Sequence, residues 1–203
     1  MTRRLLRAGD PGLEPSASLA DVERLLIAHR RATPAALRDT ADQMLAFARE
    51  HPDALVRTCL EGHFTGSALV LDATGERALF LFHRKLQRWL QPGGHADGDG
   101  NLVSTAWREA TEETGIDGLA IDPRPIDLDV HVIEAGADPR HLHLDVRFLV
   151  VAPAGAVERG NDESEALRWV TAEEATGLSI DEGTRRLFSA GRARFAEPIT
   201  AGG

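Results

Sequence analysis

The chain has 203 residues, enough for one well-cored domain with an additional element but short for two full domains. Hydrophobic residues make up 42% of the sequence and charged residues 27%, a composition typical of globular proteins. The net charge of −9 argues against a general binder of nucleic acids or anionic membranes, because both need a basic surface. A local basic patch on an acidic body stays open.

The start of the chain and its cysteine content predict a cytoplasmic protein. The first residues include arginines but no apolar core of signal-peptide length, and no segment approaches the ~18 to 20 apolar residues of a membrane helix. Cys59 is the only cysteine, so no intrachain disulfide can form, and a lone thiol suits a reducing compartment. We expect Cys59 to be a small buried side chain rather than a reactive one.

Two helices are predicted before the first strand. Apolar residues recur at helical spacing through residues 19–30 and again through residues 34–50. Thr33 is expected to cap the second helix, with Pro34 in its first turn. We therefore predict that residues 1–58 form a helical N-terminal extension.

From Gly62 onward the sequence predicts strands joined by turns. The expected strands cover residues 63–72, 77–84, 89–95, 126–133, 141–152 and 166–170. Thr171 is expected to cap a short helix, and residues 181–195 are expected to form a terminal helix. Because most strands are linked by hairpins, the prediction for residues 59–203 is an α+β domain with a mixed β-sheet and a helix on each face.

The sequence after Asn101 predicts a helix that gathers three carboxylates on one face. Asn101 is a candidate N-cap, and Gly115 is a candidate C-terminal stop. Glu109, Glu112 and Glu113 share one side of this helix, away from the apolar stripe that would pack on the sheet. Like charges at this spacing cost about 0.2–0.5 kcal/mol per pair when exposed, and a divalent cation would remove the penalty.

Two interpretations of this acidic face remain open from the helix alone. The face can be solvated surface on which Arg108 pairs with Glu112, or it can be a metal site. The preceding Pro92-Gly93-Gly94 sequence favours the metal site, because backbone without Cβ atoms can approach the same ion or a phosphate. On its own, a Pro-Gly-Gly sequence is more typical of a tight turn.

The spacing Gly94-x13-Arg108-Glu109-Ala110-x-Glu112-Glu113-x-Gly115-Ile116 resembles the Nudix box, a long and specific signature. The resemblance covers about residues 60–185 and implies a Nudix-type α/β/α sandwich with the N-terminal helices outside it. The early glutamate of the box falls on Gly100, and Asp99 or Asp97 could replace it if the loop is shifted. We expect the absence of this glutamate to affect the partner of Arg108 and the rigidity of the loop more than the metal site. Ala110, smaller than the usual aliphatic residue, is a minor packing change.

The resemblance also implies Mg²⁺ or Mn²⁺ held by Glu109, Glu112, Glu113 and the backbone carbonyl of Gly93. Such a metal bridges carboxylate and phosphate, stabilises charge as water attacks phosphorus, and makes that water more acidic. A carboxylate within hydrogen-bond reach of the water can act as general base, and Glu109 is one candidate for this catalytic role.

A second candidate base lies in the acidic sequence over residues 161–170. In some family members a loop glutamate lies six residues before a strand tryptophan, and this position corresponds to Glu163 before Trp169. Glu165 is the less favoured choice in the same loop. The alternative is that the loop is simply solvated.

The candidate substrate-binding residues are Arg84, Lys85, Arg88, His95 and His143. The three basic residues precede the glycine pair and could contact phosphate. Alternation places His143 on one strand face with His141 and Asp145, where they could contact phosphate, the attached group or a metal ligand. Half-exposed strand surface is the alternative, and a zinc site would require tetrahedral convergence that the sequence alone does not show.

The expected function is hydrolysis of a diphosphate linkage in a nucleoside diphosphate derivative or a related small organic diphosphate. The three box glutamates favour an enzyme, whereas Gly100 leaves room for a non-catalytic Nudix-like module that binds a nucleotide as a sensor. An isopentenyl diphosphate isomerase is disfavoured because Cys59 precedes the first core strand. A long RNA substrate is disfavoured by the net charge. A homodimer through residues 18–57 or the sheet edge is an open alternative.

Overall fold

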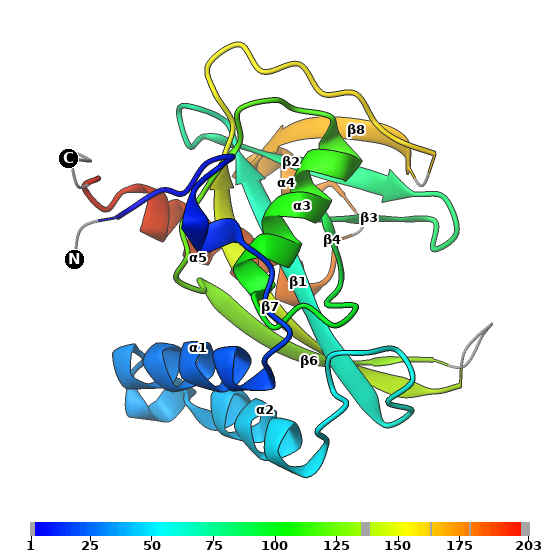
Figure 1. Ribbon diagram of the computed structural model, residues 1–203. Coiled ribbons are helices and arrows are strands. Elements are labelled where there is room, and N and C mark those ends of the chain that lie inside the picture. Colours follow the sequence, from blue (N-terminus) through cyan, green and yellow to red (C-terminus); the bar gives the residue numbers. More distant parts are fainter. Residues whose placement is uncertain (1–2, 135–138, 163, 179, 200–203) are drawn as a thin grey trace.

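The computed structural model describes residues 3–134, 139–162, 164–178 and 180–199 (Figure 1). The α-helices are α1 (Leu19–Ala32), α2 (Asp39–Glu50), α3 (Leu102–Thr114), α4 (Ala172–Thr176) and α5 (Glu182–Phe195). The strands are β1 (Gly62–Leu71), β2 (Arg77–His83), β3 (Arg88–Leu90), β4 (Gly93–His95), β5 (Ala120–Ile121), β6 (Asp127–Ile133), β7 (His141–Val151) and β8 (Ser164–Thr171). Short 3-10 turns span Pro11–Leu13 and Ala35–Leu37.

The predicted start of the second helix is wrong by about one turn. Thr33 ends α1 instead of capping α2, because its backbone N–H and its hydroxyl both donate to the carbonyl of His29. After Pro34 the chain makes a 3-10 turn, and α2 begins only at Asp39. The proline therefore starts a separate short turn, although its position is equally compatible with a helix N-terminus.

The sheet is mixed, and β1 and β7 form its parallel centre. These two strands pair in register from Gly62 and Leu142 to Leu71 and Val151. The other pairings between strands of the described residues are antiparallel. β4 and β2 pair with successive parts of the other edge of β1, and β6 and β5 pair with successive parts of β7. β3 and β8 both pair with β2. The expected strand over residues 89–95 is two strands, since β3 pairs with β2 and β4 pairs with β1.

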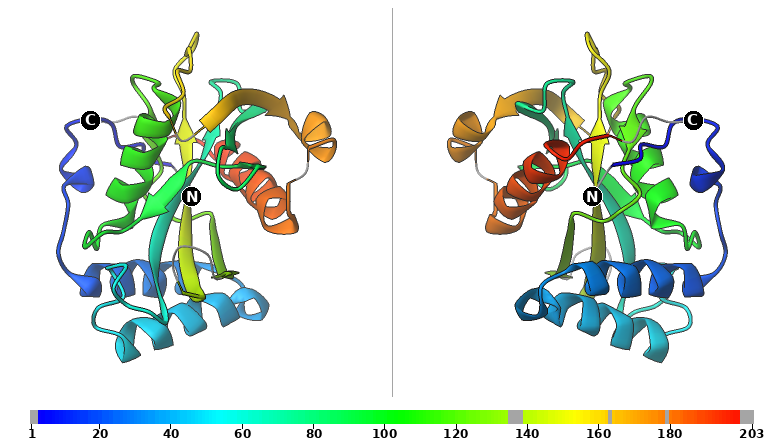
Figure 2. Two further views of the ribbon diagram at one scale, coloured as in Figure 1. Left: turned by 90° about the vertical axis from the view of Figure 1, so that its right-hand side faces the viewer. Right: turned by 90° about the vertical axis from the view of Figure 1, so that its left-hand side faces the viewer.

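The two central strands separate two layers of helix, as Figure 2 shows. Even-numbered residues of β1 such as Phe64, Ala68 and Val70 lie in the same core as the apolar side chains of α3. Odd-numbered Leu69 and Leu71 lie in a second core with the apolar side chains of α5. This alternation produces the α/β/α sandwich, and it confirms the predicted fold class.

The N-terminal helices belong to the same hydrophobic core as α3 and the sheet. Val22 and Leu26 of α1 and Met44 of α2 are fully buried members of that core. The segment before α1 returns to the sheet, where the backbone of Leu6 exchanges two hydrogen bonds with Ile121. The first and last described segments also meet, since Arg3 bridges to Ile199. None of the helices in the described ranges is long and apolar enough to cross a bilayer.

Candidate active site

Helix α3 carries the acidic cluster and is fixed at both ends as its sequence predicts. The side chain of Asn101 caps the first turn by accepting from the amide of Ser104. Gly115 adopts the left-handed conformation, with φ of 60°, and ends the helix. Leu102, Ala106 and other apolar side chains are buried against the sheet, which leaves the glutamates on the side that faces β4 and solvent.

The three glutamates of α3 have different environments. Glu113 is 5% exposed, and its carboxylate accepts a 2.9 Å hydrogen bond from the amide of Gly93. The side chain of Glu109 is 15% exposed and lies against Gly94, where an added Cβ would collide with its carboxylate. Glu112 is different, because its side chain is 57% exposed and pairs with Arg108 at 3.3 Å. Two carboxylates therefore meet the glycine pair and one does not.

These oxygen ligands fit a hard divalent cation. Carboxylates and a glycine carbonyl are groups that Mg²⁺ accepts, and Mg²⁺ commonly uses one or two protein carboxylates with water and substrate phosphates. The absent Cβ of Gly94 leaves the space that the Glu109 carboxylate occupies. The box glutamates are not among the compact three-ligand groups in the described part of the chain. Glu112 would join Glu109 and Glu113 only after turning away from Arg108.

The loop before α3 has no room for a side chain at position 100, where the Nudix box has its early glutamate. An added Cβ at this position would collide with the backbone carbonyl of Ser18. The carboxylate of Asp99 accepts from the amides of Ser16 and Asn101 at 2.9 and 2.8 Å, which ties the loop to the N-terminal segment. Neither acidic residue of the loop replaces the box glutamate as partner of the box arginine. Asp97 pairs with Arg57, whereas Arg108 pairs with Glu109 at 2.7 Å and with Glu112.

The three basic candidate residues lie together at the β2–β3 hairpin. Arg84 and Lys85 are in its turn, Arg88 begins β3, and all three are exposed. The adjacent Gln87 donates a 3.0 Å hydrogen bond to the carboxylate of Glu165. Glu165 was expected in a loop, but it lies in β8, so the hairpin turn contacts the start of this strand. Glu163 itself lies outside the described residues.

The two candidate histidines are brought together from different strands. The Nε2 atoms of His95 on β4 and His143 on β7 are 3.2 Å apart. Burial lowers the pKa of His95 to about 4 and that of His143 to about 2. The charge of Arg57 adds to the shift of His95, and repulsion between the clustered histidines adds to that of His143. The two rings are consequently neutral at pH 7.

A buried charged network lies beside the histidines. Alternation predicted that Asp145 shares the strand face of His143, but the hydroxyl and arginine partners around Asp145 were not predicted. Asp145 is 2% exposed and accepts hydrogen bonds from the hydroxyls of Thr65 and Ser67 at 2.9 and 2.8 Å. Arg147 donates to the same carboxylate at 2.7 Å. The sequence signal for this network lies in the odd-numbered residues of β1 and β7, which share one face of the sheet. Along each strand these residues are polar first and apolar afterwards.

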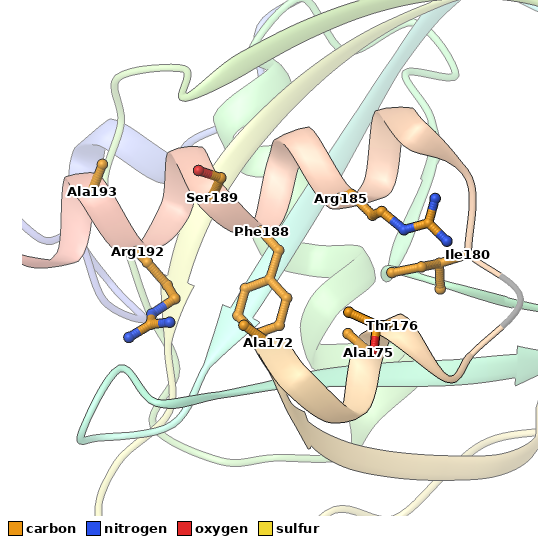
Figure 3. A pocket seen from close by; sticks show the side chains of 9 residues that line it. All are labelled: Ala172, Ala175, Thr176, Ile180, Arg185, Phe188, Ser189, Arg192 and Ala193. Carbon is orange, nitrogen blue, oxygen red and sulfur yellow. The ribbon is translucent and has the colours of Figure 1, made fainter.

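A cavity of about 470 Å³ lies between α4 and α5, away from the box (Figure 3). Phe188 points from α5 towards Ala172 of α4, and Arg185 and Arg192 lie on either side of it. All of the lining residues come from positions 172–193, so this cavity contains none of the predicted catalytic, substrate-binding or metal-binding residues.

Residues 63–190 match the sequence profile of the NUDIX domain. The chain belongs to the NUDIX family. Its box, with glutamates on α3 and glycines on β4, lies within the matched region, so the resemblance predicted from the sequence is confirmed. The expected mixed sheet and helices agree with this assignment.

Curated relatives of this NUDIX protein include a protein of Mycobacterium tuberculosis, from two strains, named provisionally as 8-oxo-dGTP diphosphatase 3. It is 32% identical over 132 residues, and the match covers 60% of this chain. The match spans only 58% of the relative's length.

Two solved structures share the fold of this NUDIX protein. A C. elegans Ap4A hydrolase in a binary complex has a TM-score of 0.54 and 19% identity over 66% of this chain and 97% of its own. The NUDIX domain of Shewanella oneidensis NrtR, complexed with ADP ribose, has a TM-score of 0.53 and 14% identity. That match covers 73% of this chain and 98% of the other. Identities this low support the fold alone.

Proposed function

We propose that this NUDIX protein is a metal-dependent hydrolase of a diphosphate linkage in a nucleoside diphosphate derivative or a related small organic diphosphate. The observation that carries the proposal is the meeting of two α3 carboxylates with adjacent glycines of β4. Glu109 packs on Gly94, and Glu113 accepts the amide hydrogen of Gly93. An ordinary solvated acidic face would not hold Glu113 buried at 5% exposure.

In this proposal Glu109, Glu112, Glu113 and the carbonyl of Gly93 hold Mg²⁺ or Mn²⁺. The bound ion would offset the charge of the diphosphate and of the attacked phosphoryl group, and would acidify a water molecule. Glu109 would accept the proton of that water, and Glu163 is the alternative base. The exposed cations at positions 84, 85 and 88 would attract the anionic substrate, while His95 and His143 would contact the phosphate or the attached group.

The names of the relatives support a diphosphatase and suggest the first substrates to test. One relative is named for an oxidised purine triphosphate and a structural neighbour for a dinucleotide. The acidic chain makes a long nucleic acid a poor substrate, since it lacks an overall basic surface. A cytoplasmic location and a homodimer remain predictions.

The test is product release from nucleoside triphosphates, dinucleotides and nucleotide sugars in the presence of Mg²⁺ or Mn²⁺. Glu109→Gln and Glu113→Gln should lower turnover by at least about 10²-fold, because each removes a charge used on the transition state. Glu50→Gln is the matched control, since Glu50 is an exposed glutamate at the end of α2. Turnover that survives both box substitutions would contradict the proposal.

A nucleotide sensor is the second candidate function, and the Gly100 position favours it. The N-terminal segment fills the place where the side chain of the early box glutamate would begin. Saturable nucleotide binding without turnover of any substrate in the panel would support the sensor over the hydrolase.

A further inference from the structure

A group of histidines occupies one end of the polar face of the central strands. His63 of β1, His95 of β4 and His143 of β7 each offer one ring nitrogen, and these three atoms lie within 4.8 Å of one another. The rings line a pocket of about 170 Å³, with His141 in the same wall. Three strands that are separate in the sequence therefore deliver imidazoles to one point.

The sheet register explains why these side chains converge. His63 is directly paired with His143 between the parallel strands, and His95 is paired with Thr65, the next residue on the same face of β1. Paired residues of neighbouring strands project to the same side of a sheet. The convergence is thus fixed by backbone pairing, and no flexible loop has to supply a ligand.

His63 is the clearest sign that the cluster is incomplete. It is 4% exposed, and neither of its ring nitrogens makes a hydrogen bond within the described structure. A buried polar group without a partner costs free energy, so such groups usually have a protein, water or metal partner. The ring lies 4.8 Å from that of His95 and 5.0 Å from that of His143, between centroids.

His141 shows the same feature and has a defined tautomer. Its Nδ1 is 2.7 Å from the carbonyl oxygen of Pro139, which can only accept, so Nδ1 carries the proton. The other nitrogen, Nε2, is left with a lone pair, and among the described residues it is buried without a partner. Metal-binding histidines commonly donate one nitrogen to a carbonyl and bind the ion with the other.

We propose that His63, His95 and His143 bind one divalent transition-metal ion, best matched by Zn²⁺, with His141 as the candidate fourth ligand. Zinc–nitrogen distances of about 2.0–2.1 Å in a tetrahedron require nitrogen atoms about 3.3 Å apart. The Nε2 atoms of His95 and His143 already have a separation of 3.2 Å. Imidazole ligands suit zinc and its neighbours, whereas Mg²⁺ prefers oxygen.

The surroundings of this histidine site are compatible with a cation. Arg57 lines the same pocket, but its guanidinium is paired with Asp97 through two 2.8 Å hydrogen bonds. The site uses none of the box glutamates. It is therefore a second metal site, separate from the box, although it shares His95 and His143 with the proposed substrate contacts.

The test is zinc uptake by the full chain, purified without a histidine tag, stripped of metal and kept in excess Mg²⁺. Calorimetry should find one Zn²⁺ per chain, with affinity reduced at least 10-fold in His95→Gln and in His143→Gln. His29→Gln, on α1, is the matched histidine control and should bind like the unsubstituted chain. Glu113→Gln should also retain binding, which separates this site from the box.

A second measurement guards against misfolded variants. Zn²⁺ should raise the unfolding temperature of the original chain and of His29→Gln but not of the two site variants. Co²⁺ in the original chain should give the visible absorption of a four-coordinate ion without a thiolate charge-transfer band. Absence of zinc uptake would overturn the proposal. Loss of binding in His51→Gln together with a thiolate band would do the same, because it would assign the metal to the nearby group of His51, Cys59 and Glu61.

Discussion

The backbone carbonyl of Ser18 occupies the space where a side chain on Gly100 would begin. The first residue belongs to the N-terminal segment and the second to the loop before the box helix. The amide of Gly100 also donates to the carbonyl of Ser16, so the contact is a docking of backbone on backbone. The absence of a side chain at position 100 and the docking of the N-terminal segment on this loop therefore go together.

Gly100→Ala should destabilise the protein by about 1–3 kcal/mol, the usual cost of forcing extra atoms into a packed contact. The neighbouring atoms are backbone, so they cannot move aside as a flexible side chain could. Denaturant unfolding measures the loss. Gly177→Ala is the control, because an added Cβ there meets its nearest neighbour at 3.4 Å and the φ of −84° suits alanine. Equal stability of the two variants would disprove the steric argument.

Gly94→Ala should lower turnover by about 10²-fold, the scale expected when a reacting group is displaced by roughly 1 Å. The added methyl would occupy the position of the Glu109 carboxylate and push it away from β4. Steady-state kinetics with the best substrate of the panel measures the effect, and thermal unfolding checks that the fold persists. An unchanged kcat would show that Glu109 does not need its place on Gly94.

The sequence predicted the elements well where a single local signal decided them. The cap at Asn101 and the stop at Gly115 are such signals, and they placed α3 correctly. The prediction for Thr33 was wrong because a threonine hydroxyl can form a hydrogen bond with the end of the helix before it or with the start of the helix after it. Only the tertiary packing of the two helices selects between these choices.

The parts of the site that could not be predicted from the sequence depend on contacts between distant segments. The register of β1 with β7 pairs His63 with His143, residues 80 positions apart, and no local pattern specifies that pairing. The docking of Ser18 on Gly100 is equally non-local. Alternation showed which residues share a face, but it could not show that the faces meet.

The carboxylate of Asp129 should make folding stability depend on pH in the acid range. A hydrogen bond with His131, followed by the charge of Arg147, lowers the pKa of Asp129 well below its ordinary value despite partial burial. An aspartate with a depressed folded-state pKa stabilises the protein above about pH 4, the unfolded value, and the contribution is lost as pH falls through the folded value. The charged or titratable groups around it are His131, Arg147, Arg186, Asp127 and Asp181.

The measurement is the free energy of unfolding in urea between pH 5 and pH 2. The original chain should lose stability more steeply below about pH 4 than Asp129→Asn, which has no proton to gain at this position. Other carboxylates titrate in both proteins, so the difference between the two curves isolates Asp129. Parallel curves would show that its pKa is not depressed by folding.

Arg147 should contribute more to stability than any half-exposed arginine of the same network. Its side chain is 5% exposed and pairs with Asp145, Asp127 and Asp129 at 2.7 to 3.2 Å. Removing one partner of a buried ion pair typically costs about 3–5 kcal/mol, because the remaining charge stays buried without compensation. Arg147→Met, which preserves much of the volume, should lose stability on this scale.

Arg186→Met is the matched comparison, since Arg186 reaches Asp127 and Asp129 from α5 with a side chain 49% exposed. An ion pair open to solvent is worth about 0–1 kcal/mol, so this variant should lose much less. Asp145→Asn should recover part of the loss in the Arg147→Met background, because it neutralises the carboxylate left behind, whose hydroxyl partners on β1 can reorient. Additive losses in the double variant, measured by urea unfolding, would mean that the two residues do not act as a buried pair.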